Sequence, residues 1–540
     1  MSSQPPLNEP VHLYAPGSPE RARLRAAIRD MEAAAPHNVP LHIGGRSVDG
    51  HGERITVSAP HRHTLAMVEA STATTDDVRA AVDAALAAHH DWSTAPWETR
   101  ASVFLRAADL LSGPFRDRLN AATILGQSKS VHQAEIDAAC ELIDFWRWNV
   151  HFGEQLQQMQ PVSAAGTWNR MDHRPLEGFV LAISPFNFTS IGGNLAAAPA
   201  IVGNTVVWKP ATTALLAAHV IMEILEAAGL PPGVINMIAA PGAAVSEAAV
   251  QHPSLAGIHF TGSTDTFQHL WNTVAANLGN YRTYPRLVGE TGGKDFVLAH
   301  PSASTDALLV GLLRGSFEYQ GQKCSASSRA YIPTSVWEQL RHPLAMATEA
   351  IPVGDPADFS TFMGAVIDEP SFRKHEAVLT AARADADLTL VAGGECDSDV
   401  GWFVRPTILA TSNPQHELLK RELFGPILTV FPYPDSDWRS VLDLVDRTSP
   451  YALTGAVFAN DRAAVDEAAA RLRYAAGNFY VNDKPTGAVV GQQPFGGARM
   501  SGTNDKAGSA LNMLRWVSPR VIKETFVPPT EWRYPHQDPD

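Results

Sequence analysis

Short apolar runs alternate with longer stretches of helical periodicity along most of the chain. Four such runs, at 178–183, 204–208, 234–240 and 256–260, are separated by segments whose apolar residues recur at helical spacing. The helix expected at 213–228 has a clear end, because a glycine and two prolines follow it. Strands that alternate with helices in this way predict an α/β fold with a parallel, doubly wound sheet.

The same alternation continues in the second half of the chain. A strand is expected at 296–299, a helix at 304–317, and two further strands at 455–458 and 478–481. The stretch 482–502 is rich in glycine, proline and polar residues, and loops of that length are usually functional or disordered. Other expected features are a Pro-rich surface arm over the first 35 residues with one helical stretch at 19–35, helices at 75–88, 99–111 and 134–148, and an edge or inter-subunit strand at 521–526.

A doubly wound sheet binds its ligands at the carboxyl ends of the strands. Lys209 and the turn Gly262-Ser263 fall at such ends, where backbone N–H groups and a helix N-terminus can hold a phosphate. No Gly-x-Gly-x-x-Gly sequence occurs, so a dinucleotide site is indicated by topology alone. The competing interpretation of Lys209 is an exposed lysine in a turn.

Composition excludes several classes of protein. Hydrophobic residues make up 45% of the chain and charged residues 18%, as in an ordinary globular protein. The net charge of −14 argues against a nucleic-acid or membrane-surface binder, and no apolar run reaches the ~18 residues of a membrane span. Three scattered cysteines suit neither a disulfide scaffold nor a zinc site, and the first ten residues lack the features of a signal peptide, so a cytoplasmic location is expected.

The chain contains twenty histidines, which are candidate metal ligands. They include two close pairs, His61 with His63 and His89 with His90, but no His-Glu-x-x-His sequence. We expect both pairs on the solvated surface and no metal site.

Cys324 is the candidate nucleophile. It lies between Lys323 and Ser325 after an apolar helical run, although a free cysteine is more commonly a small buried hydrophobe. Glu290 lies on a glycine-flanked turn that lets a carboxylate approach a substrate, and Asn187 lies in a strand-to-helix turn where its amide can donate to an oxyanion. A thiol, a base, an amide donor and a dinucleotide site meet the needs of aldehyde oxidation. In that reaction the thiolate attacks the carbonyl, hydride leaves to a nicotinamide, and a base-activated water hydrolyses the thioester.

Six short sequences between residues 184 and 426 resemble the ordered motifs of the NAD(P)-dependent aldehyde dehydrogenases. They are Ser184-Pro-Phe-Asn187, Trp208-Lys-Pro210, Phe260-Thr-Gly-Ser263, Glu290-Thr-Gly-Gly-Lys294, Gly321-Gln-Lys-Cys324 and Glu422-Leu-Phe-Gly-Pro426. Longer sequences resemble one branch of that superfamily, the L-glutamate γ-semialdehyde (1-pyrroline-5-carboxylate) dehydrogenases, which catalyse the second step of proline catabolism. They are 317–326, 482–498 and 501–506, with Asn8-Glu-Pro-Val11 near the start and Trp532-Arg-Tyr534 near the end.

This resemblance implies an aldehyde dehydrogenase-like fold and roles for individual residues. Cys324 would be the nucleophile, Glu290 the general base for thioester hydrolysis, and Asn187 the oxyanion donor together with the Cys324 backbone N–H. NAD would be the cofactor, with expected contacts at Ser184, Lys209, Gly262, Ser263, Thr264, Asp265, Thr266, Glu422 and Phe424. The substrate would be L-glutamate γ-semialdehyde, with expected contacts at Phe188, Lys323, Ser325, Gly487, Ala488 and Phe495.

Two positions depart from the superfamily pattern. Thr212 stands where many members have a glutamate that reads the ribose 2′-hydroxyl, so this acidic determinant of NAD over NADP is missing. Phe267 stands where many members have a glycine, so the phosphate turn is expected to differ locally. NAD remains the expected cofactor, because the branch is generally NAD-linked.

The resemblance also implies a division into domains. An N-terminal arm is expected at 1–35, a Rossmann-type NAD-binding domain at 36–160 and 179–289, an α/β catalytic domain at 290–503, and a small β oligomerisation flap at 161–178 and 504–540. Closure of the active site between subunits makes a homodimer the minimum assembly. A proline dehydrogenase domain would need several hundred more residues, so a separate enzyme would supply the substrate.

Three alternatives stay open. The nearest is a dehydrogenase for another acidic semialdehyde, such as succinic semialdehyde, although Ser325 and the Gly487-Ala488 turn favour the glutamate branch. A cysteine hydrolase or acyltransferase would pair Cys324 with a histidine, but no histidine motif stands out and the dinucleotide domain would have no purpose. A binding protein on an old enzyme scaffold would not need the intact catalytic positions.

Overall fold

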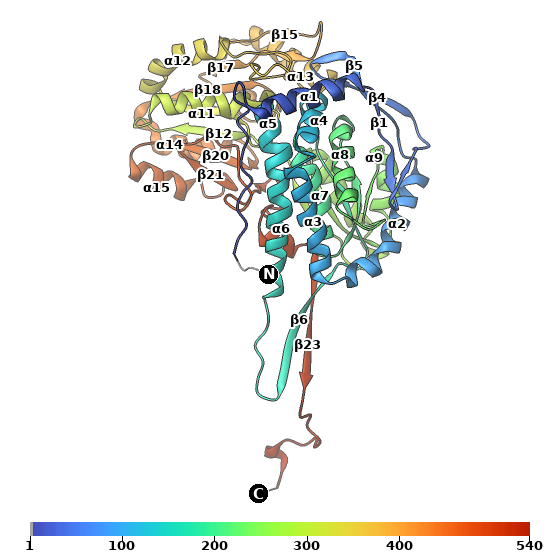
Figure 1. Ribbon diagram of the computed structural model, residues 1–540. Coiled ribbons are helices and arrows are strands. Elements are labelled where there is room, and N and C mark those ends of the chain that lie inside the picture. The colour runs from blue at the N-terminus through green and yellow to red at the C-terminus, as the bar shows by residue number, and fades with distance from the viewer. Residues whose placement is uncertain (1–3, 540) are drawn as a thin grey trace.

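The computed structural model describes residues 4–539, which form two lobes and a projecting flap (Figure 1). Each lobe is built around a seven-stranded sheet in which most neighbouring strands are parallel, and this confirms the predicted α/β class. The first three residues of the expected N-terminal arm and the last residue of the expected flap lie outside the described residues.

The first sheet contains the four strands expected between residues 178 and 260. Its order is β11-β10-β7-β8-β9-β2-β3, and the first five strands are parallel. The chain starts at β7 in the middle, moves outward through β8 and β9, and then crosses to β10 and β11. The order therefore reverses between β7 and β10, where a doubly wound sheet opens a crevice for a ligand. The strands are β2 (Leu41–Ile43), β3 (Arg46–Val48), β7 (Phe179–Ile183), β8 (Thr205–Lys209), β9 (Ile235–Met237), β10 (Leu255–Thr261) and β11 (Arg286–Glu290).

Helices pack around the first sheet (Figure 1). Its central strands are continuous apolar runs because both of their faces are covered, and Val180, Leu181, Val206 and Val207 are fully buried. The helices of this lobe are α1 (Pro19–Ala33), α2 (Thr75–Thr94), α3 (Trp97–Ser112), α4 (Arg116–Gln127), α7 (Thr189–Ile201), α8 (Leu215–Ala227), α9 (Gly242–Val245) and α10 (Thr264–Ala276).

The helix expected at 134–148 is present but irregular. It runs from α5 (Val131–Ala134) through a π-helical segment at Glu135–Glu141 into α6 (Leu142–Gln157). Wide turns of this kind occur frequently at functional sites. This one carries acidic side chains that face the candidate site described below.

The second sheet has the order β14-β17-β18-β13-β12-β20-β21, and β14 alone is antiparallel to its neighbour. The strands expected at 296–299, 455–458 and 478–481 are confirmed as β12, β20 and β21. Its strands are β12 (Asp295–Ala299), β13 (Ser327–Pro333), β14 (Leu388–Ala392), β17 (Thr407–Thr411), β18 (Ile427–Tyr433), β20 (Thr454–Phe458) and β21 (Asn478–Val481). Its helices are α11 (Thr305–Phe317), α12 (Thr334–Glu349), α13 (Glu369–Ala384), α14 (Trp438–Thr448) and α15 (Arg462–Arg471).

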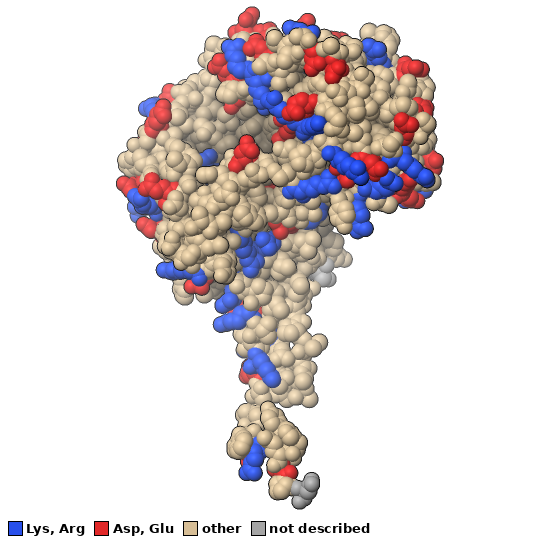
Figure 2. Space-filling view, turned by 180° about the vertical axis from the view of Figure 1, so that it is seen from behind, with Lys and Arg blue, Asp and Glu red and all other residues tan. Residues whose placement is uncertain are grey.

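The flap consists of β6 (Thr167–Pro175) and β23 (Val517–Thr525), which pair antiparallel along their whole length. It projects from the first lobe, and the C-terminal segment continues beyond it (Figure 1). The strand expected at 521–526 is therefore present, but it begins at Val517. Figure 2 shows acidic and basic side chains intermingled over the body, and further basic side chains along the flap.

The remaining elements lie outside the two large sheets and the flap. They are β1 (His37–Asn38), β4 (Arg54–Ala59) and β5 (Arg62–Ser71), which form a small sheet, with β15 (Cys396–Asp397), β16 (Phe403–Val404), β19 (Tyr451–Ala452), β22 (Ala498–Arg499) and α16 (Ala510–Leu514). Within residues 4–539, no helix combines the length and the apolarity needed to cross a membrane.

Candidate active site

A cavity of about 410 Å³ brings together residues from distant parts of the chain. Cys324 and Glu290 both line it. So do all six residues expected to contact the substrate, namely Phe188, Lys323, Ser325, Gly487, Ala488 and Phe495. Neither Asn187 nor any of the expected cofactor contacts is among the described residues that line it.

The turn before Cys324 has an unusual backbone. Tyr319, Gln320 and Gly321 have positive φ angles of 50°, 55° and 63°, so the chain reverses sharply after α11. The Gln320 side chain fixes this turn, because its amide nitrogen donates to the carbonyl oxygens of Ser128 (2.9 Å) and Ala365 (2.6 Å). Strained backbone that is held by its surroundings is typical of functional sites.

The Cys324 thiol is buried, with 9% of the residue exposed. Burial raises the pKa of this thiol well above its ordinary value, and the carboxylates of Asp295, Glu290 and Glu422 raise it further. In this state the group is a neutral thiol at pH 7. Because the thiolate is the nucleophilic form, the proton must leave before attack.

Asn187 lies at the start of α7, where β7 has just ended. Its Nδ2 donates to the carbonyl oxygen of Gln322 at 3.0 Å, which fixes the amide beside the segment that carries Cys324. Asp137 holds the helix start, because its carboxylate accepts from the backbone N–H groups of Thr189 (3.1 Å) and Ser190 (3.2 Å). An anionic side chain at a helix N-terminus is stabilising.

Glu290 is the last residue of β11. Its Oε2 accepts a hydrogen bond from the Gly497 N–H at 2.9 Å. The segment 501–503 holds both of its neighbours, because Thr503 N donates to Gly289 O (2.8 Å) and Thr291 N donates to Ser501 O (2.9 Å). Burial raises the pKa of the Glu290 carboxyl well above its usual range. A carboxyl tuned in this way suits a general base that works near neutral pH.

Several expected cofactor residues lie at the carboxyl end of β10, next to the point at which the strand order reverses. Ser263 caps α10 by accepting from Thr266 N at 3.2 Å, and Thr264, Asp265 and Thr266 form the first turn of that helix. A Cβ at Gly262 would collide with the ring of Phe260, so a bare backbone fits there. These are the features of a phosphate site at a helix N-terminus.

Other expected cofactor residues take part in internal contacts. Lys209 ends β8 half-buried, burial lowers its pKa, and no carboxylate in residues 4–539 pairs with it. Ser184 Oγ accepts from the indole Nε1 of Trp208 at 2.9 Å. Glu422 Oε1 accepts from the backbone N–H of Gly293 at 2.9 Å, and the ring of Phe424 meets that of Phe186 edge-on at 5.9 Å.

The two departures from the superfamily pattern have different structural consequences. Phe267 stacks on Phe260 with 5.3 Å between ring centroids, and a Cβ at Gly289 would collide with its ring. The larger side chain is therefore accommodated beneath the phosphate turn by a glycine next to Glu290. Thr212 is exposed and starts a short 3₁₀ turn, so it brings no charge to the crevice.

The expected substrate-binding turn is linked to the nucleophile segment. Ser325 Oγ and Thr486 Oγ1 lie 2.8 Å apart, within hydrogen-bonding distance. Gly487 has a φ of 94°, and Lys484 Nζ donates to the Thr486 carbonyl at 3.2 Å. Lys484 also lines the cavity, although sequence reasoning gave it no role. Lys323 is partly neutralised, because its ammonium contacts Glu318 Oε2 at 3.1 Å.

Acidic side chains from another element of the cavity lining were also missed. Asp137 and Glu141 line the cavity from the π-helical segment, and Ser190 Oγ donates to Glu141 at 2.8 Å. Burial and the neighbouring Asp137 raise the pKa of Glu141. The available signal was a cluster of acids within an otherwise apolar helix, since acidic residues are rarely buried without a partner.

Among the described residues, no hydrogen bond joins a histidine to the Cys324 thiol. His259 is the histidine among the described residues that line the cavity, and its Nδ1 contacts the carbonyl oxygen of Leu195 at 3.0 Å. Burial lowers its pKa to about 3. This arrangement weighs against a cysteine hydrolase that pairs Cys324 with an imidazole.

The expectation that both histidine pairs lie on the surface is wrong for His61. It is buried, and its Nε2 lies 3.4 Å from Asp355, because the turn between β4 and β5 packs against the second lobe. In the described part of the chain, no group of three or more histidine, cysteine or acidic side chains could hold a metal ion.

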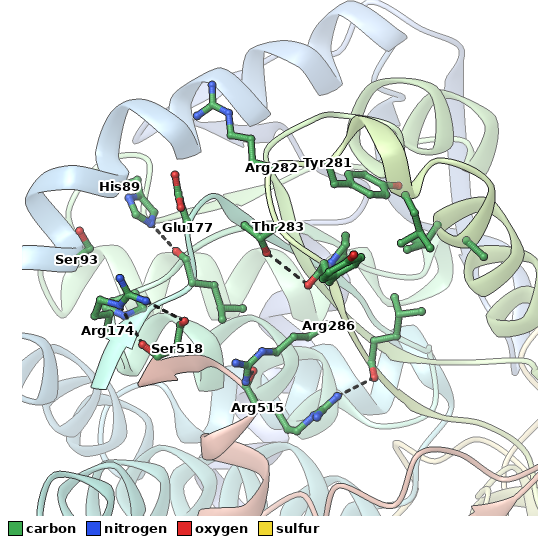
Figure 3. A pocket seen from close by; sticks show the side chains of 18 of the residues that line it. His89, Ser93, Arg174, Glu177, Tyr281, Arg282, Thr283, Arg286, Arg515 and Ser518 are labelled. Carbon is green, nitrogen blue, oxygen red and sulfur yellow. Dashed lines mark hydrogen bonds between the residues drawn. The ribbon is translucent and has the colours of Figure 1, made fainter. Parts of the chain in front are cut away.

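A wider hollow of about 1590 Å³ lies at the foot of the flap (Figure 3). Arginine side chains project into it from three segments, and Arg174 Nη2 donates to Ser518 Oγ at 3.3 Å. None of the described residues that line it was expected to bind substrate or cofactor. This hollow is therefore distinct from the candidate active site.

Comparison with known proteins defines the class. The chain belongs to the aldehyde dehydrogenase family, whose model matches residues 47–519. The mitochondrial delta-1-pyrroline-5-carboxylate dehydrogenase of Mus musculus is 50% identical over 534 residues, 99% of this chain and 95% of its own length. The crystal structure of the delta-pyrroline-5-carboxylate dehydrogenase from Mycobacterium tuberculosis bound with NAD is 57% identical, with a TM-score of 0.96, covering 100% of this chain and 99% of its own. These relatives confirm the resemblance that the motifs indicated.

A third relative is longer than this chain. The structure of proline utilization A (PutA) from Bdellovibrio bacteriovorus is 28% identical and has a TM-score of 0.92. The match covers 98% of this chain but 55% of that one. PutA therefore contains a large part that has no counterpart here.

The cytoplasmic location expected from the sequence is wrong. The relatives from mouse, cattle and human are all named as mitochondrial proteins. Free cysteines indicate a reducing compartment rather than a particular one, so their number could not separate the cytosol from another reducing compartment.

Proposed function

We propose that this chain oxidises L-glutamate γ-semialdehyde to L-glutamate with NAD, which is the second step of proline catabolism. One observation carries the proposal: the thiol of Cys324, the carboxyl of Glu290 and the polar turn at Gly487 line the same cavity. The names of the relatives from mouse and Mycobacterium tuberculosis support this substrate and cofactor.

In the first half of the reaction, the Cys324 thiol releases its proton to solvent, and the resulting thiolate attacks the aldehyde carbon. A carbon–sulfur bond forms, and the carbonyl oxygen takes the negative charge. Asn187 Nδ2 has two hydrogens, and because one is donated to Gln322, the other is free for the oxyanion. NAD, when bound, supplies the hydride acceptor that turns the thiohemiacetal into a thioester.

In the second half, Glu290 removes a proton from water, which attacks the thioester carbon and releases L-glutamate and the thiolate. The raised pKa of Glu290 supports this role, because a more basic carboxylate removes a proton from water more readily than an ordinary one. The Gly497 N–H holds this carboxylate at the cavity wall.

The crevice between β7 and β10 fits a dinucleotide. The capped N-terminus of α10 and the bare backbone at Gly262 suit a pyrophosphate, and the unpaired ammonium of Lys209 suits a ribose hydroxyl. We assign Ser184, Glu422 and Phe424 to the same cofactor. Thr212 offers no repulsion to a 2′-phosphate, so NADP is expected to be a measurable but weaker cofactor.

The α-carboxylate and the α-ammonium of the substrate need binding groups of opposite charge. We propose that the Gly487-Ala488 backbone and the Ser325 hydroxyl hold the substrate carboxylate, with the ammonium of Lys484 nearby. We further propose that Glu141, from another element of the cavity lining, receives the substrate ammonium. A buried carboxylate and a buried ammonium both need such partners, because their desolvation is costly. Phe188 and Phe495 would flank the methylene groups.

We propose the domain division given by the resemblance, with boundaries after residues 35, 160, 178, 289 and 503, and at least a homodimer. The flap supports this assembly, because a two-stranded ribbon is marginally stable alone and this one exposes Trp168 and Val521. We also propose that a separate proline dehydrogenase supplies the substrate, and the longer PutA chain supports a link between the two activities.

A kinetic comparison of cofactors and semialdehydes tests the function. Formation of NADH or NADPH is followed at 340 nm with L-glutamate γ-semialdehyde, succinic semialdehyde and an unsubstituted aliphatic aldehyde of similar length. The highest kcat/KM is expected for L-glutamate γ-semialdehyde with NAD. A higher kcat/KM for succinic semialdehyde, or a strong preference for NADP, would overturn the assignment.

A further inference from the structure

The N-terminal segment Asn8–Tyr14 forms part of the cavity wall. It runs along α5 and α6, beside the junction of the two lobes (Figure 1). Asn8, Glu9 and Val11 line the same cavity as Cys324, although about 300 residues separate them along the chain. Terminal segments are usually poorly ordered unless specific contacts hold them.

The Asn8 side chain joins two elements that do not follow each other in sequence. Its Nδ2 donates both to Asp144 Oδ2 of α6 and to the Val490 carbonyl oxygen, each at 2.8 Å. Its Oδ1 accepts from Gln492 Nε2 at 2.9 Å. Val490 and Gln492 belong to the loop that carries Gly487 and Ala488. One amide therefore bridges helix α6 and the substrate-binding turn.

Charged groups fix the segment on either side of this bridge. Glu9 N donates to Asp144 Oδ1 at 2.7 Å, and the Glu9 carboxylate lies 2.6 Å from both Arg116 and Arg147. Further along, Glu135 accepts from His12 N (2.8 Å) and the Tyr14 hydroxyl (2.7 Å). The segment is thus anchored to α6 and to the π-helical segment before it, and these contacts do not involve the loop that carries Gly487 and Ala488.

We propose that Asn8 is a positioning residue for substrate recognition: anchored through residues 9–14, it holds the 486–490 turn at the distance from α6 that the amino-acid end of the substrate requires. This inference rests on the proposed function. The α-carboxylate and α-ammonium bind to different elements of the cavity lining in that proposal, so the spacing between these elements selects for an amino-acid aldehyde. An aldehyde without these groups does not depend on the spacing.

Asn8→Ala removes the bridge while leaving the anchors in place. The KM for L-glutamate γ-semialdehyde is expected to rise about three- to tenfold, the usual effect of losing one such link, with kcat changed less than about twofold. Binding of the product L-glutamate, measured by calorimetry, should weaken by the same factor. An unsubstituted aliphatic aldehyde should be unaffected. Leu13→Ala is the matched control, because this side chain is 82% exposed in the same segment.

A double variant separates a specific bridge from a general disturbance. Gln492→Ala removes the partner of Asn8 Oδ1. The double variant should therefore raise KM by less than the product of the two single-variant factors, because both substitutions break the same link. The inference would be overturned by full additivity, by an unchanged KM in Asn8→Ala, or by an equal loss for both aldehydes. The proposed function would still stand in each case, provided that the wild-type enzyme is active on the semialdehyde. A wild-type enzyme inactive on the semialdehyde would overturn both.

Discussion

At the scale of single residues, burial controls the reactivity of Cys324. Burial is the main cause that raises the pKa of this thiol, and three neighbouring carboxylates raise it further. The free enzyme therefore contains little thiolate at pH 7. We expect iodoacetamide to alkylate Cys324 slowly at pH 7. The rate should rise mainly above pH ~8.5, which is the usual pKa of a free cysteine. Peptide mass spectrometry across a pH series measures this rate, with Cys324→Ala giving the background from Cys140 and Cys396. Rapid alkylation that is independent of pH between 6 and 8 would contradict the raised pKa.

The same shift has a consequence for stability. The folded state holds the Cys324 proton more tightly than the unfolded chain does, so the unfolded chain loses that proton at a lower pH. The contribution of this thiol to the free energy of unfolding therefore falls as pH rises from the unfolded pKa toward the folded one. The buried carboxyl of Glu290 acts in the same direction, over an interval that starts near the ordinary carboxyl pKa.

Substitution of Ser325 tests whether this residue binds the substrate carboxylate. Its hydroxyl contacts Thr486 in the structure, so it can hold the turn, the substrate carboxylate, or both. Ser325→Ala is expected to lower kcat/KM for L-glutamate γ-semialdehyde about ten- to hundredfold, because a hydrogen bond to a charged group is worth ~1.5–3 kcal/mol. An aliphatic aldehyde should be a poor substrate that the variant barely affects. Thr486→Val is the control that keeps the serine; equal losses for the two aldehydes in Ser325→Ala would assign Ser325 to the nucleophile instead.

Sequence motifs predicted the residues at the reacting end better than those at the remote end. Cys324 and Glu290 stand in short, glycine-flanked turns that are recognisable locally, and both line the cavity. Glu141 and Asn8 line it as well. They reach it only because the π-helical segment and the N-terminal segment pack beside the cavity. A local pattern can indicate that acidic residues such as Glu141 are buried, but it does not show which cavity they line, because that depends on packing between distant segments.

At the scale of elements, the start of α7 depends on a buried ion pair. Lys129 Nζ lies 2.5 Å from Asp137, both side chains are almost completely buried, and the ammonium also faces the rings of Phe188 (4.2 Å) and Tyr319 (4.4 Å). Asp137 in turn caps the helix that positions Asn187.

Lys129→Met is expected to destabilise the fold by about 3 kcal/mol, because it leaves a buried carboxylate without its counter-ion. Urea unfolding followed by circular dichroism measures this loss. The control is Arg79→Met, which breaks an exposed pair with Glu247 and should cost less than about 1 kcal/mol. Similar losses in the two variants would mean that the buried pair does not stabilise α7 as described.

Hydrophobic periodicity predicted the first sheet more completely than the second. The strands β7 to β10 are continuous apolar runs between helices, which is the pattern of a buried parallel sheet. The strands β13 and β18 escaped prediction because each contains a proline near its end, Pro333 and Pro432, and proline within a run argues against a strand. Their position inside the second lobe, rather than their local sequence, makes them strands.

At the scale of the whole molecule, the flap indicates an assembly larger than one chain. Apolar side chains are exposed along it and beyond it, including Trp168, Val521, Phe526 and Val527. We expect sedimentation equilibrium to give at least a dimer, and the double variant Trp168→Glu with Val521→Glu to shift it toward the monomer, because buried carboxylates without partners are costly at an interface. Leu390→Glu, at an exposed leucine of β14, is the control. A wild-type protein that stays monomeric at micromolar concentration would contradict the proposed role of the flap.

The central claim is that Cys324 forms a thioester with the substrate and that Glu290 activates the water that releases it. Stopped-flow mixing with NAD and L-glutamate γ-semialdehyde tests both roles in one experiment, through the time course of NADH at 340 nm. Cys324→Ala is predicted to bind NAD, as titration of protein fluorescence would show, but to form no NADH. Glu290→Gln is predicted to give a burst of about one NADH per active site and then slow turnover, since hydrolysis becomes limiting. Wild-type steady-state turnover in either variant would contradict the account.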